Sequence, residues 1–180
     1  MRRHPGACAR VRPLLWRAIG IVFLSHASAD ADFIRLLRAA LLADGYLTWM
    51  APDDIHPGEL WADAIERGIS TSDLVLVAVT ASSNASPQVA KEVDSADRHG
   101  KTIVPVIVDG PPPTGGLAYH LNSLQWIDVR SAPDGASRAD IVVARVSDMS
   151  AKPRTSPAPP RPPAPRSEAR RDDFIAPDNW

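Results

Sequence analysis

The sequence predicts an α/β protein in which a parallel sheet of five strands is covered by helices on both faces. Two observations carry the prediction. Short apolar runs alternate along the chain with longer segments whose apolar residues recur at helical spacing. The runs are also apolar throughout, which is typical of strands that are buried on both faces of a parallel sheet.

The apolar runs themselves are the predicted strands. They cover residues 21–24, 46–49, 74–79, 103–108 and 124–129. Right-handed crossovers between successive parallel strands favour the order 2-1-3-4-5, which is called flavodoxin-like. Pro105 counts against the fourth strand, because proline has no backbone N–H to donate to a neighbouring strand.

The first two predicted helices are recognised by their apolar faces. Ser28 is the expected N-cap of the first helix, which ends at Asp44-Gly45. Its apolar face is formed by Phe33, Leu36, Leu37, Ala40 and Leu41. The second helix is expected to place three residues on one face, namely Trp61, Ile65 and Ile69.

The third predicted helix has the clearest boundaries. Ser86 is the expected N-cap, Pro87 stands in the first turn, and His99-Gly100 closes the helix. A last helix is predicted over residues 136–146.

The formal net charge of −1 hides an uneven distribution along the 180 residues. Residues 1–20 carry five arginines and no acid, residues 21–147 have 9 basic against 16 acidic side chains, and residues 148–180 have 6 against 5. An acidic central part argues against nucleic acid as the main partner, because phosphate binding needs a basic face.

The composition also divides the chain into three parts. Residues 1–19 are predicted to be a disordered basic leader, residues 20–147 a folded domain, and residues 148–180 a proline-rich disordered tail. Seven of the fourteen residues from 152 to 165 are proline, which favours an extended polyproline II spacer.

The cysteine count and the hydropathy indicate a cytoplasmic protein. Cys8 is the single cysteine, so an internal disulfide framework and a cysteine-rich zinc site are excluded. The apolar runs are shorter than the roughly 20 residues that a membrane-spanning helix needs, so no membrane partner is expected.

A ligand site in this fold is expected at the carboxyl ends of the strands, near the point where the strand order reverses. The loops at residues 25–30, 50–59 and 80–86 are therefore the candidates. The sequence has no Gly-x-Gly-x-x-Gly motif, and Gly100-Lys101-Thr102 lacks the earlier glycine of a phosphate-binding loop.

The second of these loops is a candidate metal site. It contains four potential ligands, which are Asp53, Asp54, His56 and Glu59. In a loop bounded by prolines, solvated charge is the better interpretation, so neither a metal nor a bound cofactor is predicted.

The third predicted helix carries the most informative acid. Val89, Val93 and Ala96 define its buried face, and Glu92 lies about 60–70° from the centre of that face at 100° per residue. We expect Glu92 at the edge of the buried face, where a carboxylate suits electrostatic or acid–base work. The alternative is an ordinary surface glutamate close to Lys91.

Six segments of the chain, taken in order, carry a family resemblance. They are residues 21–30, 45–49, 53–61, 72–80, 86–93 and 100–106. Together they resemble a TIR domain of the bacterial kind. The resemblance covers about residues 20–147, including the proline in the fourth strand.

The resemblance implies a five-stranded flavodoxin-like fold and two kinds of activity. TIR domains cleave NAD⁺ at the nicotinamide–ribose bond or assemble through TIR–TIR contacts, and many bacterial members do both in antiphage defence. NAD⁺ would be the substrate, and no cofactor or metal is implied. A separate sensor protein is a possible further partner.

The resemblance also assigns roles to particular residues. Glu92 corresponds to the catalytic glutamate. The implied substrate-binding residues are Ser25, His26, Ala27, Ser28, Asp54, Gly58, Leu60 and Gln88. The chain departs from the enzymes at two positions, because Gln88 and Leu60 stand where enzymatic relatives often have aromatic side chains.

Two functions from different classes follow. The first is a self-associating NAD⁺ glycohydrolase in bacterial defence signalling, favoured by Glu92. The second is a TIR adaptor without turnover that acts through TIR–TIR interaction, favoured by Gln88 and Leu60. A nucleoside-processing transferase of related fold, which also uses a glutamate, stays open as a third.

Overall fold

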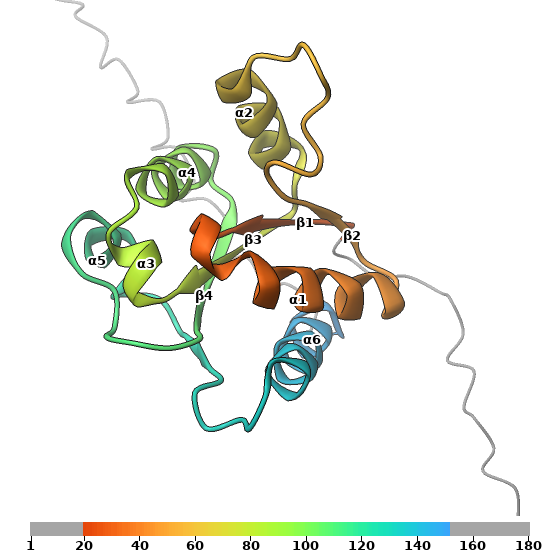
Figure 1. The fold of residues 1–180 in the computed structure, drawn as a ribbon, viewed down its shortest axis with the longest axis vertical. Helices are drawn as coiled ribbons and strands as arrows, with labels where there is room; N and C mark the ends of the chain where they lie inside the picture. The colour runs from red at the N-terminus through yellow and green to blue at the C-terminus, as the bar shows by residue number, and fades with distance from the viewer. Residues whose placement is uncertain (1–19, 152–180) are drawn as a thin grey trace, which may run out of the picture.

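The computed structural model describes residues 20–151, and these form an α/β fold around one parallel sheet (Figure 1). The order of the strands in the sheet is β2-β1-β3-β4-β5, which confirms the predicted fold class. The strands are β1 (Ile21–Ser25), β2 (Leu47–Trp49), β3 (Leu74–Val79), β4 (Thr102–Ile107) and β5 (Ile127–Asp128). The predicted leader, residues 1–19, and residues 152–180 of the predicted tail lie outside the described residues. The first four residues of the predicted tail, 148–151, are helical, so the folded domain ends later than predicted.

Helices cover both faces of the sheet. After a short 3-10 helix, η1 (Ser28–Asp30), they are α1 (Ala31–Ala43), α2 (Trp61–Thr71), α3 (Ala81–Asn84), α4 (Pro87–Arg98), α5 (Gly115–Leu121) and α6 (Gly135–Ala151). Helices α1 and α6 pack against each other on one face (Figure 1). Helices α2, α4 and α5 cover the other face, with α4 between its two neighbours.

The two faces of β3 show why the strands are apolar throughout. Leu74, Leu76 and Ala78 point into the core beneath α1 and α6. The alternate residues, Val75, Val77 and Val79, point into the second core beneath α2, α4 and α5. All six are buried, so a polar residue at any of these positions would be desolvated.

Pro105 fits its strand because of where β5 begins. Pro105 pairs in register with Val77 of β3, as the predicted strand requires. On the other side, β5 pairs only with Val106 and Ile107. The part of β4 that contains Pro105 is therefore an edge on that side, where a missing donor is tolerated.

The first helix begins later than predicted. Ser28 is not its N-cap, because residues 28–30 form the tighter turn η1 and α1 starts at Ala31. Its buried face is formed by Ile34, Leu37 and Leu41, whereas Leu36 is largely exposed. The other predicted residues of this face are confirmed, because Leu37 and Leu41 are buried and Phe33 and Ala40 pack against the core; only Ile34 was missed.

Other boundaries also differ from the prediction. In α2, Ile65 and Ile69 are buried as expected, but Trp61 is half exposed because it stands in the first turn, beyond the sheet. The last strand has two residues rather than six, and α6 runs on to Ala151. Helices α3 and α5 were not predicted; α3 is a single turn and α5 opens with two glycines.

Candidate functional site

A cavity of about 340 Å³ lies at the carboxyl ends of β1 and β2, where the sequence analysis expected a ligand. Its walls come from the end of β1, the first turns of α1, the start of the β2–α2 loop, and the first turns of α2 and α4. The lining residues are Phe23, Leu24, His26, Ala27, Ser28, Ala31, Arg35, Met50, Ala51, Pro52, Trp61, Ser86, Gln88 and Glu92.

Glu92 is the buried acid of this cavity. Only 5% of the residue is exposed. The Ser25 hydroxyl donates a hydrogen bond to Oε2 at 2.6 Å, and the Gln88 amide donates one to Oε1 at 3.2 Å. Both carboxylate oxygens are therefore held in place by donors of the same chain.

This burial corrects the expected edge position of Glu92. The angle on its own helix was a poor guide, because the end of β1 covers the flank of α4 on which Glu92 lies. Burial raises the pKa of the Glu92 carboxyl, and the hydrogen bonds from Ser25 and Gln88 offset part of that rise. A carboxyl with a raised pKa in a cavity is a common property of catalytic acids and bases.

Most of the predicted substrate-binding residues meet at this cavity. His26, Ala27, Ser28 and Gln88 line it together with Glu92, and Ser25 contacts Glu92 directly. The His26 ring is turned back on its own strand, with Nδ1 at 3.0 Å from the Leu24 carbonyl oxygen.

The predicted residues of the β2–α2 loop lie elsewhere. Asp54, Gly58 and Leu60 do not line the cavity. Asp54 holds the loop to α1, because its carboxylate accepts hydrogen bonds from Arg38 and from the Met50 backbone, both at 2.8 Å. Leu60 is 72% exposed.

The far end of the same loop is also fixed. Glu59 pairs with Arg67 of α2 at 2.9 Å and accepts a hydrogen bond from the His56 backbone. These bonds lower the pKa of Glu59, the His56 N–H most of all. Among residues 20–151, no cluster of His, Cys, Asp and Glu is arranged to hold a metal ion.

The sequence analysis missed two prominent lining residues. Trp61 supplies an aromatic side chain from the first turn of α2, directly after Leu60. Arg35 reaches the cavity from the second turn of α1. The sequence pattern that could have identified Arg35 is its i, i+4 spacing from Ala31, which lines the cavity one helical turn earlier.

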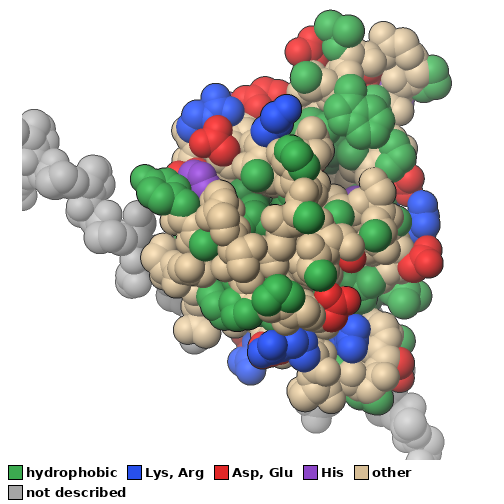
Figure 2. Space-filling view, turned by 60° about the vertical axis from the view of Figure 1, so that its left-hand side comes forward, with side chains coloured by type: hydrophobic (Ala, Val, Ile, Leu, Met, Phe, Trp, Pro, Cys, Tyr) green, Lys and Arg blue, Asp and Glu red, His purple; other side chains and the backbone are tan. Residues whose placement is uncertain are grey.

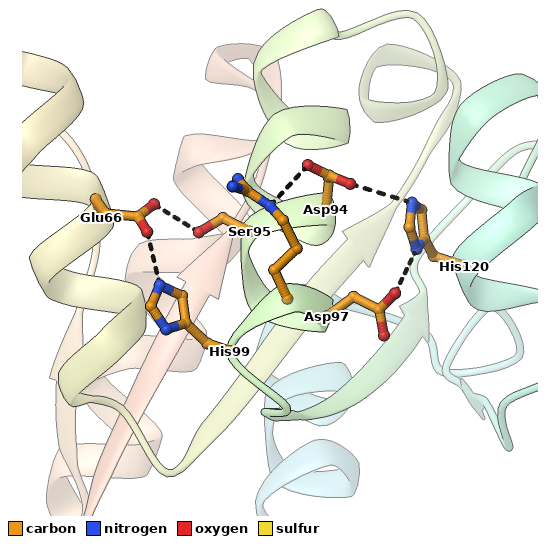
Figure 3. A network of polar contacts seen from close by, with 7 residues as sticks. Glu66, Asp94, Ser95, Asp97, His99 and His120 are labelled. Atoms are coloured by element: carbon orange, nitrogen blue, oxygen red, sulfur yellow. Dashed lines mark hydrogen bonds and ion pairs between the residues drawn. The ribbon is translucent and has the colours of Figure 1, made fainter. Parts of the chain in front are cut away.

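Towards the C-terminal end of α4, polar contacts tie this helix to both neighbouring helices (Figure 3). Glu66 of α2 accepts hydrogen bonds from Ser95 and from the His99 ring, both at 2.6 Å. These two bonds lower the pKa of Glu66. On the side of α5, His120 contacts Asp97 at 3.2 Å. The helix that carries Glu92 is thus anchored on both sides.

A larger cavity lies far from these residues. It has a volume of about 620 Å³ and lies near the amino ends of β4 and β5, against α6. It contains none of the predicted site residues, and its position opposite the carboxyl ends of the strands is unusual for a ligand site in this fold.

Comparison of the sequence with models of known protein families shows to which family the chain belongs. A model described as "TIR domain" matches residues 22–150, nearly the whole described fold. The chain belongs to the TIR domain family. The predicted resemblance to a TIR domain is thereby confirmed.

Solved TIR structures share the fold of this TIR domain at low sequence identity. The TIR domains of the activated Roq1 resistosome, which recognises the pathogen effector XopQ, are 17% identical with a TM-score of 0.60, over 71% of this chain and 99% of that one. The TIR domain of the Toll-related receptor TRR-2 from Hydra magnipapillata is 18% identical with a TM-score of 0.58, over 69% and 96%.

A third similar structure is the RPS4 and RRS1 TIR domain heterodimer, at 15% identity and a TM-score of 0.55, over 73% of this chain and 98% of that one. No curated protein sequence matches the chain significantly. Within residues 20–151, none of the helices has the length and apolar character needed to span a bilayer.

Proposed function

We propose that this TIR domain is an NAD⁺ glycohydrolase that cleaves the nicotinamide–ribose bond and is activated by self-association. The observation that carries the proposal is the buried Glu92 carboxylate in a cavity at the carboxyl ends of β1 and β2. Family membership supports it, since the resemblance assigns the catalytic glutamate to this position. The same resemblance implies a role in bacterial antiphage defence, with a separate sensor protein as a partner.

The chemistry requires little beyond a placed negative charge. As the bond between C1 of the ribose and the pyridinium nitrogen breaks, its electron pair leaves with nicotinamide and positive charge develops on the ribose. An ionised Glu92 beside the ribose would stabilise that charge. Water then adds to C1 and releases a proton, so NAD⁺ and water give ADP-ribose, nicotinamide and H⁺.

The neighbours of Glu92 support this role. Donors from Ser25 and Gln88 fix the carboxylate before substrate binds, so little reorganisation is needed during the reaction. The aromatic ring of Trp61 lines the same cavity and offers the stacking surface that Gln88 lacks.

The size of the cavity suggests which half of the substrate it takes. At about 340 Å³ it is near the lower end of the roughly 300–1,000 Å³ of ligand pockets. We therefore place the nicotinamide and its ribose inside and the rest of the dinucleotide beyond the rim. A neighbouring molecule would then complete the site, which is why activity should depend on self-association.

A second function is favoured by one observation. Both oxygens of Glu92 already have donors within the chain, so the carboxylate is satisfied without a substrate. A TIR adaptor that acts only through TIR–TIR contacts needs no carboxylate that is available to a substrate, so this arrangement of Glu92 also fits an adaptor.

Nicotinamide release from NAD⁺ by concentrated protein separates the two functions. Glu92→Gln is the control, because glutamine keeps the shape and an acceptor for Ser25 while removing the charge. If the protein is an NAD⁺ glycohydrolase, the wild type should release nicotinamide and Glu92→Gln should release none. If it is an adaptor, neither protein should release nicotinamide at a concentration where the wild type self-associates.

A further inference from the structure

Arg35 is the feature of the cavity that the proposed chemistry does not use. Among the fourteen lining residues it is the single arginine or lysine. Its side chain is 56% exposed, whereas Glu92 is buried, so the two charged groups mark the rim and the interior of one cavity. The cavity thus has a positive rim and an acidic interior.

The present partner of Arg35 holds it weakly. Arg35 Nη1 lies 3.3 Å from Asp32 Oδ1 one turn earlier on α1, and the Asp32 side chain is fully exposed. Exposed pairs of this kind contribute little to stability, since water screens them and both side chains lose freedom. An anionic ligand can therefore take Arg35 from Asp32 at small cost.

We propose that Arg35 binds the phosphate attached to the substrate ribose, so that the site selects nucleotides over bare nucleosides. This inference rests on the proposed function for the identity of the base. The contact between Arg35 and the phosphate is argued independently, from the cavity itself. A guanidinium matches the geometry of a phosphate, with two parallel N–H···O bonds. With the ribose at Glu92, its phosphate would leave the cavity past Arg35.

Kinetics on two substrates test this selection. NAD⁺ carries the phosphate, and nicotinamide riboside has the same scissile bond without it. We expect Arg35→Ala to raise KM for NAD⁺ about tenfold or more, as loss of a charged hydrogen bond implies, with kcat little changed. Cleavage of nicotinamide riboside should be unchanged, and Arg35→Lys should recover part of the NAD⁺ affinity.

Arg130→Ala is the matched control, because Arg130 is also half exposed and ion-paired, with Asp128, but lies outside the cavity. It should leave both substrates unaffected. Equal losses on NAD⁺ and nicotinamide riboside in Arg35→Ala would show a merely structural role. An unchanged KM for NAD⁺ would remove Arg35 from substrate binding.

A binding experiment keeps this inference separate from the proposed reaction. Calorimetry with ADP-ribose needs no turnover, so it works even if the wild type releases no nicotinamide. We expect ADP-ribose to bind the wild type and Arg130→Ala alike, and to bind Arg35→Ala about tenfold or more weakly. Failure of ADP-ribose to bind the wild type, or equal binding by Arg35→Ala, would overturn the phosphate contact.

Discussion

At the scale of single residues, the environment of Glu92 combines opposing effects. Burial raises its pKa, and hydrogen bonds from Ser25 and Gln88 lower it again in part. Because the net shift is upward, folding favours the protonated form. The stabilisation from this group is present below the ordinary glutamate pKa and is lost as the pH rises through the raised value. At pH values above the raised pKa, the ionised Glu92 therefore costs stability.

Glu92→Gln should make that cost visible. We expect the variant to melt higher than the wild type at mildly alkaline pH, with about 1 kcal/mol corresponding to roughly 4 °C for a domain of this size. The difference should shrink as the pH falls towards the ordinary glutamate pKa of about 4.3. Thermal melts across pH provide the test, and a difference that is constant with pH would contradict the assigned burial.

Ser25 should set the pH at which the site works. Ser25→Ala removes the donor to Glu92 Oε2, so the pKa of Glu92 should rise further. Since the proposed reaction needs the ionised carboxylate, the acid limb of the NAD⁺ cleavage profile should move to higher pH. Full pH profiles of kcat/KM measure this shift.

Ser72 provides the matched control for Ser25. It is also buried, and its hydroxyl donates to the Gly68 carbonyl oxygen at 2.6 Å, away from Glu92. Ser72→Ala should cost about 1 kcal/mol of stability without moving the pH profile. If both variants shift the profile equally, the Ser25–Glu92 bond does not tune the acid.

At the scale of elements, the β2–α2 loop is held at both ends and turns at one glycine. Arg38 of α1 holds Asp54, and Arg67 of α2 holds Glu59. Between these anchors Gly58 has a φ of +89°, a conformation that residues with a Cβ rarely adopt. The loop begins with Met50, which lines the cavity.

Gly58→Ala tests whether the loop contributes to activity. Gly45 is a matched control, because its φ is +88° and a Cβ at either glycine would meet no atom within 4 Å. Each alanine should lower the free energy of unfolding by about 1 kcal/mol. Gly58→Ala alone should lower kcat/KM for NAD⁺, and equal kinetics in the two variants would remove the loop from catalysis.

Strong local signals made some elements predictable. The third strand was predicted with its observed bounds because six apolar residues run between polar ends. The third predicted helix, α4, was found because Ser86 caps it, accepting a hydrogen bond from the Val89 N–H, and Pro87 opens it. The fifth strand came out too long because Trp126 turns aside and donates its indole N–H to the Leu121 carbonyl oxygen.

The sequence predicted those features of the site that depend on one helix or one loop alone. It did not predict the features that depend on contacts between elements. Glu92 was identified, but its burial depends on β1, which a helical projection of α4 does not include. Asp54 was expected at the substrate, yet Arg38, distant in sequence, draws its carboxylate to α1. Arg35 and Trp61 were missed because only the packed fold brings α1 and α2 to the same cavity.

At the scale of the whole molecule, two of the exposed apolar side chains lie together at the start of α2. Leu60 and Trp61 are both exposed there, and Trp61 also lines the cavity. Helix α2 and the loop before it project from the sheet (Figure 1), and hydrophobic side chains lie on this projection at the top of Figure 2. A neighbouring molecule bound at this position would both cover the apolar surface of Leu60 and Trp61 and close the cavity.

On one face of the molecule, charged side chains of both signs are interspersed. On the face drawn in Figure 2, Lys and Arg side chains lie in small groups beside Asp and Glu, without a broad basic area. Such a face lacks the continuous positive surface with which proteins track a nucleic acid backbone.

The most direct measurement is nicotinamide release from NAD⁺ per mole of protein over a wide range of protein concentration, for the wild type and Glu92→Gln. We predict that the specific activity of the wild type rises steeply with concentration, because association completes a small cavity, and that Glu92→Gln releases no nicotinamide at any concentration. Release by Glu92→Gln equal to the wild type would contradict the role of Glu92. A specific activity that is independent of concentration would contradict activation by self-association.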